Sequence, residues 1–122
     1  MKTLIQSAKD APTYVIDGNK ASTWPQLVNS INAFIPQSEW QGNSLDALDD
    51  ILYGGYGTPD RFTIVWKASE TSREALGYEA TKAYYKHLPN FEQLYEAGHI
   101  TTLFDMVVGI LRSHENIELR LE

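Results

Sequence analysis

The chain has 122 residues, of which 43% are hydrophobic and 21% charged, and its formal net charge is −6 at pH 7. This length and composition are typical of one globular domain. The sequence contains no apolar run near the ~20 residues that a membrane span needs, and its first residues lack the apolar core of a signal peptide. The absence of cysteine excludes disulfides and thiolate metal sites, and the negative charge argues against direct contact with nucleic acid. We therefore expect a cytoplasmic protein that does not bind a membrane.

The first elements in chain order are a short strand and a helix. Residues 1–12 are polar and lack periodicity, so we interpret them as an N-terminal extension. Residues 14–16 form a β-type run, which the turn signal at 17–19 closes. Thr23 is placed to cap a helix whose apolar residues recur at helical spacing, and Pro36 ends that helix.

A second helix and a second strand follow. The helix is predicted from Leu45 to about Tyr53, with Ser44 as its cap, and the glycine-rich run 54–59 stops it. Residues 62–66 are almost continuously apolar, which predicts a central strand buried on both faces.

The last part of the chain is mostly helical and ends in a strand. Short helices are predicted at 69–76, 81–88 and 91–98, and a longer helix is predicted to begin at a Thr101 cap. The strict alternation of residues 117–122 predicts a strand with one buried face. Strands separated by helices favour an α/β fold with a small parallel sheet.

The negative charge is concentrated in about one third of the chain. No Lys or Arg occurs between Lys20 and Arg61. The same stretch contains five carboxylates, which are Glu39, Asp46, Asp49, Asp50 and Asp60. Such asymmetry indicates either an electrostatic field that attracts a cationic partner or an acidic helix face that is simply solvated.

The helix from Leu45 is the candidate site. Asp46 and Asp50 are four residues apart and share a face, and Asp49 and Tyr53 lie on the same side, opposite the apolar residues. We expect this side to face solvent. Like charges at this spacing cost a helix roughly 0.2–0.5 kcal/mol, and no Lys or Arg lies close in sequence. A sequence that keeps such a cluster indicates binding at the expense of stability.

The run Trp40–Leu52 resembles the signature of the barstar family, in which an aromatic residue and a glycine precede a Leu-Asp-Ala-Leu-x-Asp motif. Residues 14–18 are similar to the first strand and turn of that family, and residues 62–67 resemble its second strand. The alternating final strand also fits. The resemblance implies an α/β domain over residues 13–122, with a three-stranded parallel sheet packed with helices and a helical insertion at about 77–100.

The resemblance also implies a function. Barstar-like proteins inhibit ribonucleases, so the chain would block a basic ribonuclease, or more narrowly act as an immunity protein against a toxin nuclease. It would be no enzyme, would need no cofactor or metal, and would be a monomer when free. Asp50 would be the central carboxylate, Asp46 its helper, Trp40 the aromatic residue of the preceding loop, and Gly42 the residue that allows close approach. The expected partner-binding residues are Trp40, Gly42, Asp46, Asp49, Asp50 and Tyr53.

The sequence departs from the family pattern in two places. Asp49 stands where the family often has tryptophan, and an acidic residue that the family uses on its last helix has no clean match, since Gly109 falls near that place and Asp105 lies about one turn earlier. Two other functions stay open. One is the same fold binding a cationic partner that is not a nuclease. The other is an enzyme that uses Asp46 and Asp50 as an acid/base pair, against which an exposed helix face offers no pocket.

Two further groups of side chains are interpreted as structural. The three histidines lack metal-ligand spacing and are expected at the surface or at helix ends; they are His87, His99 and His114. Four tyrosines could form an accessory surface, but core or half-buried packing is expected; they are Tyr78, Tyr84, Tyr85 and Tyr95.

Overall fold

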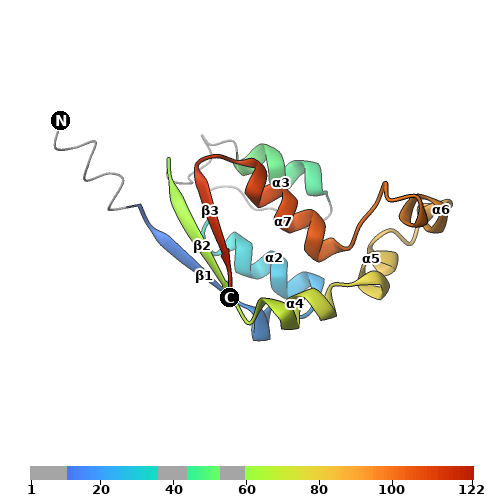
Figure 1. Ribbon diagram of the computed structural model, residues 1–122, viewed down its shortest axis with the longest axis horizontal. Coiled ribbons are helices and arrows are strands. Elements are labelled where there is room, and N and C mark those ends of the chain that lie inside the picture. Colours follow the sequence, from blue (N-terminus) through green and yellow to red (C-terminus); the bar gives the residue numbers. More distant parts are fainter. Residues whose placement is uncertain (1–10, 36–43, 53–59) are drawn as a thin grey trace.

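The computed structural model describes residues 11–35, 44–52 and 60–122. Three strands form one parallel sheet in the order β1-β2-β3 (Figure 1). They are β1 (Thr13–Asp17), β2 (Phe62–Lys67) and β3 (Ile117–Leu121). The register places Trp66 of β2 between Ile16 of β1 and Leu121 of β3. The predicted three-stranded parallel sheet, with the second strand at its centre, is therefore confirmed.

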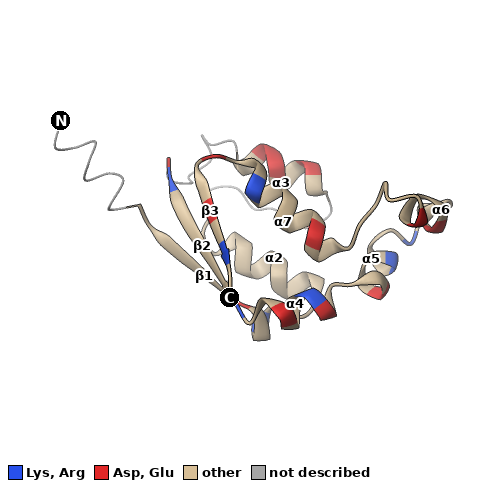
Figure 2. Ribbon diagram, in the orientation of Figure 1, with Lys and Arg blue, Asp and Glu red and all other residues tan. Residues whose placement is uncertain are grey.

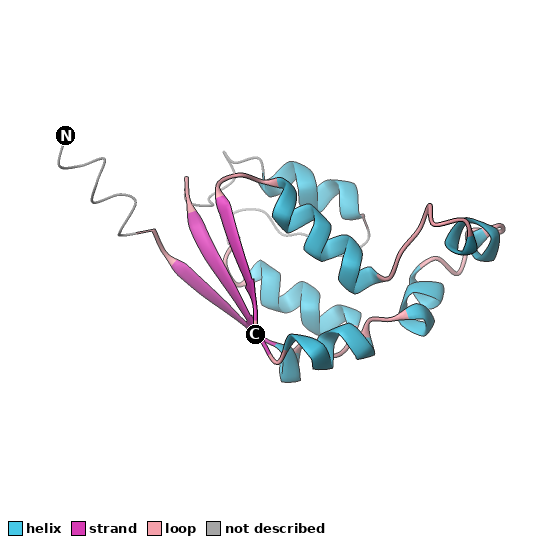
Figure 3. Cartoon of the chain, in the orientation of Figure 1, coloured by secondary structure: helices cyan, strands magenta, loops and turns pink. Residues whose placement is uncertain are grey.

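The described residues also form six α-helices and one 3-10 helix, and the α-helices lie to one side of the sheet (Figure 3). They are η1 (Gly18–Lys20), α2 (Trp24–Asn32), α3 (Leu45–Leu52), α4 (Ser69–Ala75), α5 (Tyr78–Tyr84), α6 (Phe91–Glu96) and α7 (Leu103–Ser113). None of them is long and apolar enough to cross a membrane.

Hydroxyl caps set the beginnings of the longer helices. The amide of Gln26 donates to Oγ1 of Thr23 at 3.3 Å at the start of α2, as the sequence predicts. The amide of Ala47 donates to Oγ of Ser44 at 3.2 Å at the start of α3. The cap of α7 is Thr102, whose Oγ1 accepts from the amide of Asp105 at 3.2 Å, so the predicted Thr101 cap is wrong by one residue.

The core lies between the sheet and the helices. Ile16, Ile64 and Trp66 are fully buried on the helix side of the sheet, where the rings of Trp66 and Phe104 lie 5.0 Å apart. On the other side Val15 is 56% exposed. Val65 of β2, which points to the same side as Val15, is only 8% exposed, whereas Thr63 is half-buried. The predicted burial of β2 on both faces therefore holds at Val65 and is incomplete at Thr63.

The carboxyl ends of the strands meet at the start of α4. Nε1 of Trp66 donates to Oγ of Ser72 at 3.0 Å, and that hydroxyl is 3.4 Å from the carbonyl oxygen of Gly18. Gly18 packs so closely on Ala68 that any Cβ would collide with the Ala68 carbonyl. The amide of Ser69 donates to the carbonyl oxygen of Glu122 at 2.9 Å. This junction joins the ends of all three strands.

Residues 77–100 carry α5 and α6 and are called the α5–α6 segment here; it extends away from the sheet beyond the start of α7 (Figure 1). The helix predicted at 81–88 instead spans Tyr78–Tyr84. The reason is Thr81, which is fully buried inside α5. Its hydroxyl donates to the carbonyl oxygen of Gly77 at 2.7 Å and accepts from the amide of Leu103 at 2.8 Å, which ties α5 to the start of α7.

Candidate functional site

The helix α3 presents carboxylates because its apolar residues are used against the core. Leu48 and Leu52 are fully buried, and α3 packs against α7. Asp46 and Asp50, on the other side of the helix, are exposed, as the sequence predicts. Asp46 also lies in the first turn of α3, where the helix dipole favours a negative charge. Three of the predicted site residues lie outside the described residues, and they are Trp40, Gly42 and Tyr53.

No Lys or Arg in the described ranges forms an ion pair with the α3 aspartates. Arg73 contacts Glu70 and Asp105, at 2.8 and 3.5 Å. The other two Lys and Arg ion pairs join Lys82 to Glu92 and Arg120 to Glu118. Figure 2 shows α3 with acidic residues and no basic residue of its own. The carboxylates of Asp46 and Asp50 are therefore available for a cation supplied from outside.

Asp49 differs from its two neighbours. Its Oδ1 lies 2.7 Å from Nε2 of His114, and the side chains of Asp49 and His114 are 36% and 4% exposed. Because a carboxylate oxygen accepts, Nε2 of His114 is the donor in this bond. The expectation that Asp49 faces solvent is therefore only half met, since one of its oxygens joins α3 to the C-cap residue of α7. His114 lies at a helix end, as expected, but it is buried rather than at the surface.

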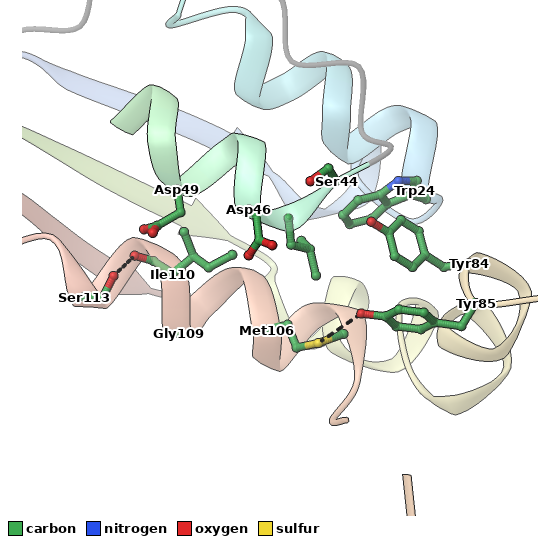
Figure 4. Close-up of a pocket in the computed structure, with 11 residues that line it drawn as sticks. Trp24, Ser44, Asp46, Asp49, Tyr84, Tyr85, Met106, Gly109, Ile110 and Ser113 are labelled. Atoms are coloured by element: carbon green, nitrogen blue, oxygen red, sulfur yellow. Dashed lines mark hydrogen bonds between the residues drawn. The ribbon is translucent and has the colours of Figure 1, made fainter. Parts of the chain in front are cut away.

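A groove of about 940 Å³ lies beside α3. Asp46 and Asp49 line it from α3, Met106 and Gly109 from α7, and Tyr84 from α5, as Figure 4 shows. The remaining lining residues are Trp24, Ser44, Leu45, Tyr85, Ile110 and Ser113. The α5–α6 segment therefore contributes a wall to a groove whose other walls are the acidic helix and α7.

The acidic helix affects the pKa of two tyrosines that line this groove. Burial raises the pKa of Tyr84 most, and the neighbouring Tyr85 and the charge of Asp46 raise it further, while a backbone hydrogen bond from Leu45 acts in the opposite direction. Burial and then Asp46 raise the pKa of Tyr85. The Asp46 carboxylate therefore lies close enough to both phenol groups to oppose their ionisation.

Gly109 and Asp105, the two residues considered for the acidic position of the family's last helix, have different surroundings in the structure. Gly109 lines the groove, whereas Asp105 does not line it and contacts Arg73. An enzyme that uses Asp46 and Asp50 as an acid/base pair would need both carboxylates in one enclosed pocket. The groove is open to solvent and Asp50 does not line it, so the structure argues against this hypothesis. Among the described residues, no three His, Asp or Glu side chains are grouped so that they could hold a metal ion.

Sequence reasoning named His114 and the Tyr84–Tyr85 pair but did not place them beside α3. His114 carries no local signal for its role, because its partner Asp49 lies 65 residues earlier in the chain. The tyrosines were singled out as a candidate accessory surface, but nothing in the sequence places them beside α3.

Comparison with known proteins gives one finding. The family model described as Barstar (barnase inhibitor) matches residues 11–106. The match includes β1, α3 and β2, covers the α5–α6 segment and ends inside α7. A search of curated proteins found no match.

Proposed function

The chain belongs to the barstar family, and we propose that it is a protein inhibitor of a basic ribonuclease that places the α3 carboxylates in the nuclease active site. The observation that carries this proposal is the pair Asp46 and Asp50, exposed on one helix face and unneutralised by Lys or Arg in the described chain. The chain itself would carry out no catalysis.

The physical reason is charge complementarity. A ribonuclease holds the phosphates of RNA with Lys and Arg side chains, and carboxylates at matching positions compete for the same cations. Arg–carboxylate pairs form short and often bidentate hydrogen bonds. A localised negative surface also increases the rate of encounter with a basic protein, by about ten- to a thousandfold at low salt.

The proposed roles follow the family pattern on this chain. Asp50 is the central carboxylate, and Asp46 supports it from one helical turn earlier. Trp40 and Gly42 would form the rim before the helix, and Tyr53 would form the rim after it. Asp49 would add charge to the same surface through the oxygen that His114 does not hold.

The experiment is an RNA-hydrolysis assay with a panel of basic ribonucleases that includes barnase. The unmodified chain is expected to inhibit at least one of them at stoichiometric concentration. Asp50→Ala is expected to weaken that inhibition by about thirtyfold or more, because it leaves a nuclease cation buried without its partner. Glu74→Ala is the matched control, since it removes an exposed carboxylate from α4 and should leave inhibition unchanged.

Circular dichroism of each variant would show that the fold is retained. An Asp50→Ala variant that inhibits as well as the parent would contradict the proposed mechanism. Binding to a basic protein without any loss of ribonuclease activity would instead favour an interaction module of the same fold. In the narrower role of an immunity protein, co-expression of the chain would protect cells from the nuclease it inhibits, and Asp50→Ala would remove that protection.

A further inference from the structure

We propose that the groove between α3, α7 and α5 receives an arginine side chain of the bound nuclease, held between the carboxylate of Asp46 and the rings of Tyr84 and Tyr85. This inference rests on the proposed function and adds to it a second contact area, beside the exposed face of α3. It also gives the α5–α6 segment a role in recognition.

The two tyrosine rings are held in place. The ring of Tyr84 meets that of Trp24 edge-on with centroids 5.2 Å apart, and that of Tyr85 with centroids 4.8 Å apart. The hydroxyl of Tyr85 lies 3.8 Å from Sδ of Met106 on α7, a contact drawn in Figure 4. A ring with fixed neighbours loses little entropy when a ligand stacks on it.

The lining of the groove selects for a cation. Asp46 and Asp49 supply negative charge, and the faces of aromatic rings attract positive charge. A phosphate would be repelled, and an apolar group would remove water from Asp46 without replacing its hydrogen bonds. A guanidinium group suits these walls better than an ammonium group, because it is planar, stacks on rings and binds carboxylates with two parallel hydrogen bonds.

The size of the groove indicates how the cation arrives. A groove of about 940 Å³ is much larger than one guanidinium group. It can hold an arginine together with the neighbouring residues of a protein loop. The occupant is therefore a surface loop of the nuclease that presents an arginine, and this fits a partner that is already basic.

Gly109 is the second observation that points to an occupant. It lies in the middle of α7, where glycine costs about 1 kcal/mol relative to alanine. Packing does not require this glycine, because a Cβ at position 109 would meet nothing within 4 Å. Gly109 lines the groove, and because it has no side chain it leaves the α7 wall of the groove open at this position. We infer that Gly109 provides access for the partner loop.

The test needs no nuclease. N-acetylarginine amide and N-acetylcitrulline amide differ in charge but hardly in shape, so each is titrated into the full chain while NMR follows the Met106 methyl and the Tyr84 and Tyr85 ring signals. The arginine amide should shift these signals saturably, with weak binding of the order of millimolar. The citrulline amide should bind at least about threefold more weakly. Equal binding of the two, or no saturable shift, would overturn the inference.

Position 109 supplies the matched variants. Gly109→Ala should raise the melting temperature and keep arginine binding, because a methyl group enters open space. Gly109→Leu should keep the melting temperature at or above that of the parent and abolish the arginine-dependent shifts, since a longer side chain crosses the groove. Unchanged arginine binding in Gly109→Leu would overturn the inference.

The two proposals fail in different ways. If the chain inhibits a ribonuclease and Gly109→Leu inhibits it equally well, the groove takes no part and only this inference falls. If Gly109→Leu weakens inhibition by about tenfold or more while the fold is unchanged, the groove is part of the interface. If the arginine amide binds but no ribonuclease in the panel is inhibited, the cation site stands and the proposed function falls.

Discussion

Asp49 and Asp50 are adjacent aspartates on α3, and replacing each with alanine is expected to change stability in opposite directions. Asp49→Ala removes the carboxylate that His114 contacts at 2.7 Å and leaves a buried ring nitrogen without that bond. Asp50→Ala removes an exposed carboxylate that lies four residues from Asp46. Both changes exchange the same two residue types inside one helix, so the gain in helix propensity cancels when the two variants are compared.

The magnitude follows from the exposure of the pair. A hydrogen bond to a charged group contributes about 1.5–3 kcal/mol when it is well buried. The Asp49 side chain is 36% exposed, which lets solvent screen the interaction, so we discount the loss to about 1–2 kcal/mol. Removing Asp50 relieves a like-charge contact of roughly 0.2–0.5 kcal/mol with Asp46. Asp49→Ala should therefore be about 1–2 kcal/mol less stable than Asp50→Ala.

Urea denaturation followed by circular dichroism measures this difference directly, provided that both variants show the same dependence of unfolding free energy on urea. In a thermal scan it corresponds to about 3–8 °C between the two midpoints for a domain of this size. Two variants of equal stability would refute the reasoning, because the bond between α3 and the end of α7 would then contribute nothing. Inhibition gives the opposite ranking, since Asp50→Ala should lose more of it.

Two more outcomes are expected from particular contacts. Gly18→Ala should destabilise the fold by roughly 2–3 kcal/mol in the same urea assay, because its Cβ would collide with the backbone of Ala68; an unchanged midpoint would show that the junction can relax. Because burial and Asp46 raise the pKa of Tyr84 and Tyr85 above that of the unfolded chain, their protonated form stabilises the fold below that pKa, and the contribution is lost as the pH rises through the folded-state pKa. Asp46→Asn should lower the pKa of both tyrosines in an ultraviolet absorbance titration, and identical titration curves would contradict their proximity to Asp46.

Local patterns in the sequence were sufficient for the sheet and the acidic helix. The alternation at 117–122 and the apolar run at 62–66 predicted two strands, and the structure has Ile117–Leu121 and Phe62–Lys67. The exposed side of α3 followed from the four-residue spacing of Asp46 and Asp50. These predictions succeeded because the period of a helix or strand decides which side chains share a face.

Other features depend on contacts between distant elements. Thr101 was predicted to cap α7, and only the structure shows that the next residue, Thr102, accepts the hydrogen bond. Thr81 looked like the start of a helix, but its buried hydroxyl bonds to Gly77 and Leu103 inside α5. The groove was beyond prediction for the same reason, since its walls come from helices whose mutual placement no local pattern encodes.

The attachment of α3 to α7 affects when the protein can act. During translation the Asp46 and Asp50 motif emerges from the ribosome well before α7, which packs against α3, and before His114, which holds Asp49. A nascent chain that stops short of α7 would carry the complete acidic motif but no surface to align it. In the proposed role, inhibition of a nuclease would therefore begin only after α7 and residue 114 have left the ribosome and packed against α3.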